Sequence, residues 1–171
     1  AITNDAHWHD GDYYTVGDGV GPTAGLALAR QIAHLTYRSD VELESRFGRT
    51  PQDDEHPYSP HIVGRNADAG RFAVQSYLDH HGHKLVRRFD AGSYVSLTDT
   101  MNTHDVSRGR GTLSEVLGTI ACPVAVAGIT SDRLYPIAQQ KQLAELIPTV
   151  RNLVQIESLY GHDGFLIEVE Q

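Results

Sequence analysis

The stretch Cys122–Gly164, CPVAVAGITSDRLYPIAQQKQLAELIPTVRNLVQIESLYGHDG, contains two short apolar runs separated by a longer segment. The first run, Val124–Ile129, consists of small and β-branched residues, which is typical of a parallel strand buried on both faces. The second run, Leu153–Ile156, predicts the next strand. Between them, Pro136–Pro148 has apolar residues at helical spacing, which predicts a crossover helix. The stretch therefore predicts a βαβ unit whose two parallel strands end at one edge of a sheet.

Two polar residues, Asp132 and His162, follow the two predicted strands. Ligands of open α/β sheets bind at the carboxyl ends of the strands. An Asp after one strand and a His after a later one occur in the Ser…Asp…His order of α/β-hydrolases, in which the Asp orients the imidazole. Singly, Asp132 could cap a helix and His162 could be a loop histidine. Together, at matched strand ends, they are predicted to be catalytic.

The segments around these two residues, GITSDRLYP and SLYGHDGFL, resemble the acid and base motifs of the homoserine O-acetyltransferases. These are acyl-CoA-dependent enzymes of methionine synthesis in the α/β-hydrolase superfamily. The resemblance extends over essentially the whole chain and keeps the order of the segments. It includes GLALARQIAHLTYRS (25–39), FGR (47–49), KLVRRFDAGSY (84–94) and NTHDVSRGRG (102–111).

The resemblance implies an α/β fold, the C-terminal part of an α/β-hydrolase with the last parallel strands of the sheet and an inserted helical lid. Residues 1–111 would form a connection and the lid, and residues 112–171 the C-terminal part of the core. The family's nucleophilic serine lies in a glycine-flanked elbow, and no G-x-S-x-G occurs in the sequence. We therefore expect a fragment that lacks the first strands, the nucleophile elbow, the oxyanion hole and the final helix.

The activity that the resemblance implies is transfer of an acetyl group from acetyl-CoA to the hydroxyl of L-homoserine. Acetyl-CoA would be a co-substrate, with no permanently bound cofactor, and the lid would contribute to a homodimer. Three alternatives stay open: a homoserine or serine O-succinyltransferase, a related esterase, and a non-catalytic helical dimerisation module.

A helix is predicted from Pro22 onward, and it places Arg30 and Tyr37, seven residues apart, on one face. An arginine in a mostly apolar helix needs a partner. That partner could be a structural carboxylate or the carboxylate of a substrate, which suits the planar guanidinium. The resemblance implies a substrate pocket formed by Arg30, Tyr37 and Asp163, with Arg30 on the carboxylate of homoserine and Asp163 on its ammonium. Asp163 could also cap a helix that starts at Gly164, either in place of this contact or in addition to it.

Elsewhere the pattern predicts helices over 71–83, ending at Gly82, and over 89–101, with an exposed loop over 50–60 and a connection without elements of its own over 1–20. Histidines cluster at His80, His81 and His83, but near a helix end they converge poorly, and the HWHD run (7–10) is expected to be loop. No metal site is therefore predicted.

Composition limits the class of protein. The chain has 171 residues, 40% hydrophobic content and a net charge of −8, which suits one domain and argues against binding nucleic acid. Cys122 is the only cysteine, so no disulfide within the chain is possible, and it is expected to be a buried small residue. No apolar run is long enough to span a membrane. We therefore expect a cytoplasmic protein that does not bind a membrane.

Overall fold

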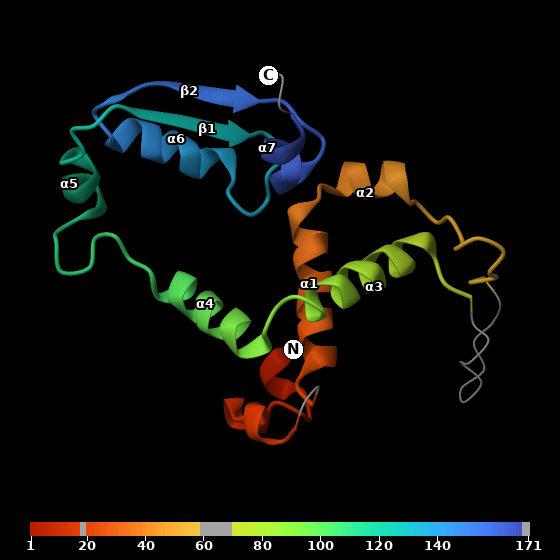
Figure 1. Ribbon diagram of the computed structural model, residues 1–171. Coiled ribbons are helices and arrows are strands. Elements are labelled where there is room, and N and C mark those ends of the chain that lie inside the picture. The colour runs from red at the N-terminus through yellow and green to blue at the C-terminus, as the bar shows by residue number, and fades with distance from the viewer. Residues whose placement is uncertain (18–19, 59–69, 169–171) are drawn as a thin grey trace. The chain divides into compact units, whose positions relative to one another are not determined.

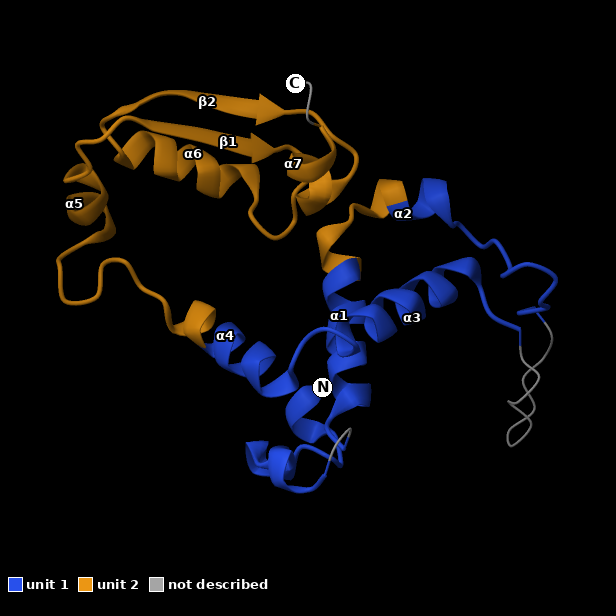
Figure 2. Cartoon of the chain, viewed as in Figure 1, with its two compact units in different colours: residues 1–34, 43–99 blue, residues 35–42, 100–171 orange. Residues whose placement is uncertain are grey.

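The structure, a computed structural model, describes residues 1–17, 20–58 and 70–168. The chain divides into two compact units, which Figure 2 shows in different colours. The first comprises residues 1–34 and 43–99, and the second comprises residues 35–42 and 100–171. The predicted division between lid and core at residues 111 and 112 stays a prediction.

The second unit contains the predicted βαβ arrangement. Strands β1 (Val124–Ile129) and β2 (Val150–Ile156) are parallel and hydrogen-bonded, and helix α6 (Ile137–Leu146) connects them (Figure 1). Strand β2 begins three residues before the predicted start because Val150 pairs with Val124. The predicted α/β fold is confirmed in this unit, and both strands end at the same edge of the sheet.

The burial of β1 differs from the prediction. Val126 and Gly128 are buried, whereas Ala125 and Ala127 are exposed, so one face of the strand is covered. Helix α6 packs closely on the covered face, since a Cβ on Gly128 would lie 2.6 Å from Cδ1 of Ile137. A run of small apolar residues does not distinguish one covered face from two, because alanine is tolerated on either. Cys122, just before the strand, is exposed rather than buried.

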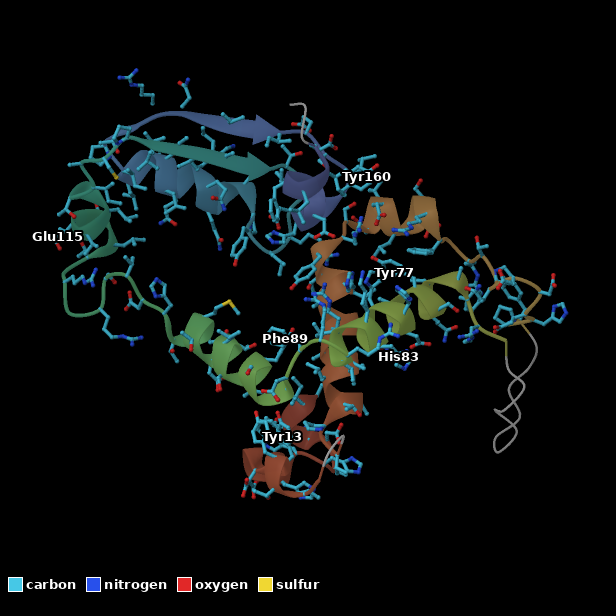
Figure 3. All side chains as sticks on the ribbon, viewed as in Figure 1. Tyr13, Tyr77, His83, Phe89, Glu115 and Tyr160 are labelled. Carbon is cyan, nitrogen blue, oxygen red and sulfur yellow. The ribbon has the colours of Figure 1, made fainter. Side chains whose placement is uncertain are left out.

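The described part of the second unit also contains three short helical elements that lie wholly within it. They are α5 (Leu113–Gly118), a 3-10 turn at Gly161–Asp163 and α7 (Gly164–Ile167). Helix α5 was not predicted, although its start carries a capping box. The Thr112 hydroxyl accepts from the Glu115 amide at 3.3 Å, and the Glu115 carboxylate accepts from the Thr112 amide at 2.7 Å; Figure 3 labels Glu115. A Thr followed three residues later by a Glu was the available sequence signal.

The described part of the first unit contains all or part of four α-helices: α1 (Thr23–Tyr37), α2 (Asp40–Arg46), α3 (Ala73–Val86) and α4 (Ala91–Thr103). The end of α1, the start of α2 and the end of α4 are assigned to the second unit. Helix α2 lies in a charged segment for which no helix was predicted. The buried core of the first unit consists of apolar side chains from the N-terminal segment and from α1, α3 and α4: Ile2, Tyr13, Leu26, Leu85 and Ala91.

Helix α3 continues past Gly82, where the sequence predicted its end. Gly82 is buried, and a Cβ there would lie 3.0 Å from the carbonyl oxygen of Ala27 on α1. The glycine therefore permits close approach of two helices and does not terminate one. His80, His81 and His83 consequently lie within the helix; His83 is labelled in Figure 3.

The N-terminal segment also differs from the expected plain connection. It forms three 3-10 turns, at Ile2–Asn4, His9–Gly11 and Tyr13–Thr15. Ile2 and Tyr13 are only 5% and 6% exposed, so the segment supplies part of the core. The predicted loop over 50–60 is described up to residue 58, and within it Pro51 bridges to Phe72 and Pro57 is buried. Residues 59 and 60 lie outside the described residues.

No helix in the described part of the chain is both long and apolar enough to cross a membrane.

Candidate active site

Asp132 lies in the turn that follows β1, and its carboxylate is held by backbone amides. One oxygen, Oδ1, accepts hydrogen bonds from the amides of Leu134 at 2.8 Å and Tyr135 at 3.0 Å. The side chain is only 7% exposed. A short Asp side chain that binds the backbone two and three residues ahead is well suited to a turn of this kind. The turn therefore fixes Asp132 and leaves its second oxygen, Oδ2, for another partner.

That partner is His162, in the 3-10 turn that follows β2. Its Nδ1 lies 2.9 Å from Oδ2 of Asp132, and its side chain is 22% exposed. An ionised carboxylate can only accept hydrogen bonds, so Nδ1 carries the hydrogen and the other ring nitrogen, Nε2, is the basic one. The structure thus brings Asp132 and His162 together in the arrangement of an oriented general base.

Aromatic rings surround the imidazole of His162. The ring centroids of Tyr37, Tyr135 and Phe165 lie 5.6, 5.2 and 5.4 Å from that of His162. Asp132 and His162 also line a cavity of about 200 Å³ in the second unit. Tyr135 and Phe165 are 54% and 57% exposed, so these rings contact the imidazole without closing it off from solvent in this chain.

The loop that carries His162 depends on Gly161. This residue has a φ of +63°, a conformation that residues with a side chain rarely adopt. Its amide donates to the hydroxyl of Ser131 at 3.0 Å, which links the His162 loop to the residue before Asp132. The acid and the base are therefore also connected through their own backbones.

Asp163 contacts an arginine and not the helix that it precedes. It occupies the N-cap position of α7, but its side chain makes no capping hydrogen bond. Its Oδ2 lies 3.2 Å from Nε of Arg38, whose Nη1 lies 3.4 Å from Oε1 of Glu42. The alternative that Asp163 caps α7 is therefore wrong, whereas its predicted contact with a substrate stays a prediction.

Sequence reasoning missed Arg38. The available signal was its spacing of four residues from Glu42, which suits an ion pair on a helix. That spacing does not indicate that Arg38 also contacts Asp163, which is distant in the sequence.

The two remaining predicted pocket residues lie in different units. Tyr37 is in the second unit, beside His162. Arg30 is in the first unit, where it lines a cavity of about 120 Å³. The other lining residues of that cavity are mostly basic: His34, His81, Lys84, Leu85 and Arg88. The roles of Arg30 and Tyr37 in substrate binding stay predictions.

Among the residues that the structure describes, no group of three or more His, Cys, Asp or Glu side chains is placed to hold a metal ion.

Comparison with known proteins shows which proteins the chain is similar to. No family model matches the chain. Over 171 residues the chain is 54% identical to the homoserine O-acetyltransferase of Thermobifida fusca (strain YX), covering 100% of the chain. It is 52% identical over 170 residues to that of Mycolicibacterium smegmatis, covering 99% of the chain. The chain is related to the homoserine O-acetyltransferases. It spans 42% of the length of each of these two relatives.

Solved structures agree with this relationship at the level of the fold. A homoserine O-acetyltransferase from Bacillus anthracis matches with a TM-score of 0.80 at 20% identity, over 98% of this chain and 43% of that one. Esterase E22 matches with a TM-score of 0.77 at 16% identity, over 98% of this chain and 44% of that one. The predicted α/β-hydrolase fold is therefore confirmed.

Proposed function

We propose that an enzyme containing this chain transfers the acetyl group of acetyl-CoA to the hydroxyl of L-homoserine. The main support is the contact of 2.9 Å between His162 and Asp132 in a chain that is 54% identical to a homoserine O-acetyltransferase. Asp132 and His162 would be the acid and the base of a triad, and the serine would come from the part of the enzyme outside this chain.

In the first half of the proposed reaction, the serine hydroxyl attacks the thioester carbonyl of acetyl-CoA while its proton passes to Nε2 of His162. The bond to sulfur then breaks, and the CoA thiolate takes that proton as it leaves. An acetyl-serine remains. Asp132 stabilises the transient imidazolium through Nδ1 and keeps Nε2 directed at the reacting atoms.

In the second half, the homoserine hydroxyl gives its proton to Nε2 and attacks the acetyl-serine. The ester bond to the enzyme breaks, and the proton returns to the serine oxygen. Homoserine must reach the acetyl-enzyme before water does, so this proposal requires an enclosure in the full-length enzyme that excludes water and favours transfer over hydrolysis.

Substrate binding in this proposal uses Arg30, Tyr37 and Asp163. Arg30 would bind the carboxylate of homoserine, and the basic residues beside it in the same cavity would favour an anion there. Asp163 would bind the ammonium group, and Tyr37 would line the pocket next to His162.

The test is release of CoA by the full-length protein with acetyl-CoA and homoserine, with O-acetylhomoserine identified by mass spectrometry. His162→Ala should lower the rate by about 10⁴-fold or more, because the acid and base steps are both lost. His104→Ala, an exposed histidine of the same unit, is the control and should leave the rate unchanged. A rate that His162→Ala does not change would rule out this mechanism.

The same assay separates the alternatives. A succinyltransferase would prefer succinyl-CoA as the donor. An esterase would hydrolyse acyl esters at a rate that homoserine does not affect, and the structural likeness to esterase E22 makes this arm necessary. A non-catalytic module would show no turnover in the full-length protein.

The proposal includes a homodimer that uses the helices of the first unit. Large apolar side chains are exposed there, with Leu28 48%, Ile32 51% and Leu97 54% exposed. Ile32→Lys should convert a dimer into a monomer in light scattering, whereas an unchanged mass would place the interface elsewhere. The cytoplasmic location stays a prediction.

A further inference from the structure

The segment 37–42, between the last residue of α1 and the first turn of α2, lies against the loop that carries His162. Ser39 is only 4% exposed and lies between the two helices. Its hydroxyl donates to the carbonyl oxygen of Leu159 and accepts from the amide of Glu42 at 3.0 Å. One buried hydroxyl thus caps the first turn of α2 and holds the start of the His162 loop.

The backbone of the segment makes direct contact with Gly161. A Cβ on Gly161 would lie 2.5 Å from the carbonyl oxygen of Tyr37 and 2.9 Å from the amide nitrogen of Ser39. No side chain fits in that space. The residue before His162 is therefore pressed against the segment, while its own amide binds Ser131 on the Asp132 side.

Arg38 adds a charged contact on the other side of His162. Its guanidinium lies 3.2 Å from Asp163 and 3.4 Å from Glu42, and the three side chains are 14%, 19% and 8% exposed. Charges that are this poorly hydrated are costly unless they are paired, so each of the three constrains the others. The residue after His162 is therefore held by an ion pair, just as the residue before it is held by packing.

We propose that the segment 37–42 positions the His162 loop, with Arg38 acting through Asp163 and Ser39 acting through Leu159. Within the described residues, these two side chains contact Leu159, Glu42 and Asp163 and not the imidazole. They are positioning residues and not catalytic ones. Because a displacement of about 1 Å in a catalytic group can cost about 10²-fold in rate, the segment matters for turnover although it performs no chemistry.

The kinetic part of this inference rests on the proposed function. In the full-length enzyme, Arg38→Met should lower kcat by about 10-fold to 10²-fold. Arg38→Lys keeps a cation at the site and should recover part of the loss. Arg151→Met, which removes an exposed arginine from β2 of the same unit, is the matched control and should leave kcat unchanged.

Coupling to Asp163 separates positioning from a general loss of stability. If Arg38 acts through Asp163, the double variant Arg38→Met, Asp163→Asn should be no slower than Asp163→Asn alone. If the two effects multiply, Arg38 acts by another route and the inference is wrong for this residue.

A measurement without substrate makes the inference independent of the reaction. Hydrogen exchange of the Gly161 amide, which donates to Ser131, should accelerate by about 10-fold or more in Arg38→Met and in Ser39→Ala. Amides of β1 should exchange as in the wild type. Exchange at Gly161 that is unchanged in both variants would overturn the inference, even for an enzyme that acetylates homoserine. Faster exchange in an enzyme that does not acetylate homoserine would retain the inference and reject only the proposed function.

Discussion

Asp90 in the first unit and Asp132 in the second are both carboxylates held by several donors, but their partners differ in kind. Asp90 accepts from the hydroxyl of Tyr13 at 2.5 Å through Oδ1, and from the hydroxyl of Tyr14 and the amide of Ser93 through Oδ2. Tyr13, labelled in Figure 3, also accepts from the amide of Gly92 at 2.7 Å. The donors of Asp90 are two phenol hydroxyls and a backbone amide.

The pKa values in the Asp90 cluster follow from these contacts. Burial raises the pKa of Asp90, but hydrogen bonds from Tyr13, Ser93 and Tyr14 outweigh it and lower the pKa to about 2. Burial, and then the hydrogen bond to Asp90, raise the pKa of the Tyr13 hydroxyl well above its usual value. The cluster is therefore fixed in one protonation state across the physiological range.

Asp132 also binds several donors, but one of them is a histidine side chain. Two backbone amides hold one oxygen, and the other oxygen binds the imidazole of His162, whose second ring nitrogen can serve as a general base. A carboxylate whose partners are hydroxyls and a backbone amide stabilises the fold. A carboxylate that orients the imidazole of a general base can also support a reaction.

The largest effect expected from this comparison is at Asp132. Asp132→Asn in the full-length enzyme should lower kcat by about 10⁴-fold, because the amide favours the wrong histidine tautomer. The free energy of unfolding should change little, since the new side chain can still accept from both amides. Steady-state kinetics and urea denaturation measure the two quantities. A large loss of stability with normal turnover would reverse the roles assigned to the two carboxylates.

Asp90→Ala should have the opposite profile. It removes charged hydrogen bonds to two tyrosines and an amide, so unfolding should become easier by about 2–4 kcal/mol. Urea denaturation measures this change. Asp54→Ala, at an exposed aspartate of the same unit, serves as the control and should be nearly neutral.

Acid should weaken the Asp90 cluster over a defined range. The folded pKa of about 2 is below the usual value of 3.8, so the stabilisation is complete above about pH 4 and is lost as the pH falls through about 2. Allowing for solvent screening, the loss should be about 1–2 kcal/mol. The difference in unfolding free energy between wild type and Asp90→Ala should shrink over this range. A difference that stays constant would mean that these contacts do not lower the pKa of Asp90.

The smallest effect is expected at Tyr14, which is 64% exposed. Tyr14→Phe removes one hydroxyl that donates to Asp90 at 2.8 Å and should cost about 0.5–1 kcal/mol. Tyr13→Phe, at the buried position, should cost more. If Tyr14→Phe lowered the free energy of unfolding more than Tyr13→Phe, burial of the hydroxyl would not determine how strongly it stabilises the Asp90 cluster.

The sequence was sufficient for the βαβ unit and for the pair formed by Asp132 and His162. Both residues follow apolar runs, and parallel strands bring their carboxyl ends to one edge, so local pattern and topology were enough. The contacts that support the site could not be predicted in this way. Ser39 and Leu159 are 120 positions apart, and Tyr13 and Asp90 are 77 apart, without any periodicity that links them.

Two errors in the helices have a physical cause. Gly82 was interpreted as a helix end because glycine is common there. Its role is instead to leave room for the close approach of α1 and α3. Helix α2 lies in a charged segment with little apolar periodicity, although Ser39 followed three residues later by Glu42 was an available signal for a helix start.

The exposed thiol of Cys122 is a site at which a label can be attached. It is the only cysteine in the chain and lies just before β1, whereas Asp132 lies just after the strand. Six residues of extended strand span about 20 Å. A maleimide dye or spin label attached there would sit at the far end of the strand from the acid residue, where it could report on motion without blocking the cavity.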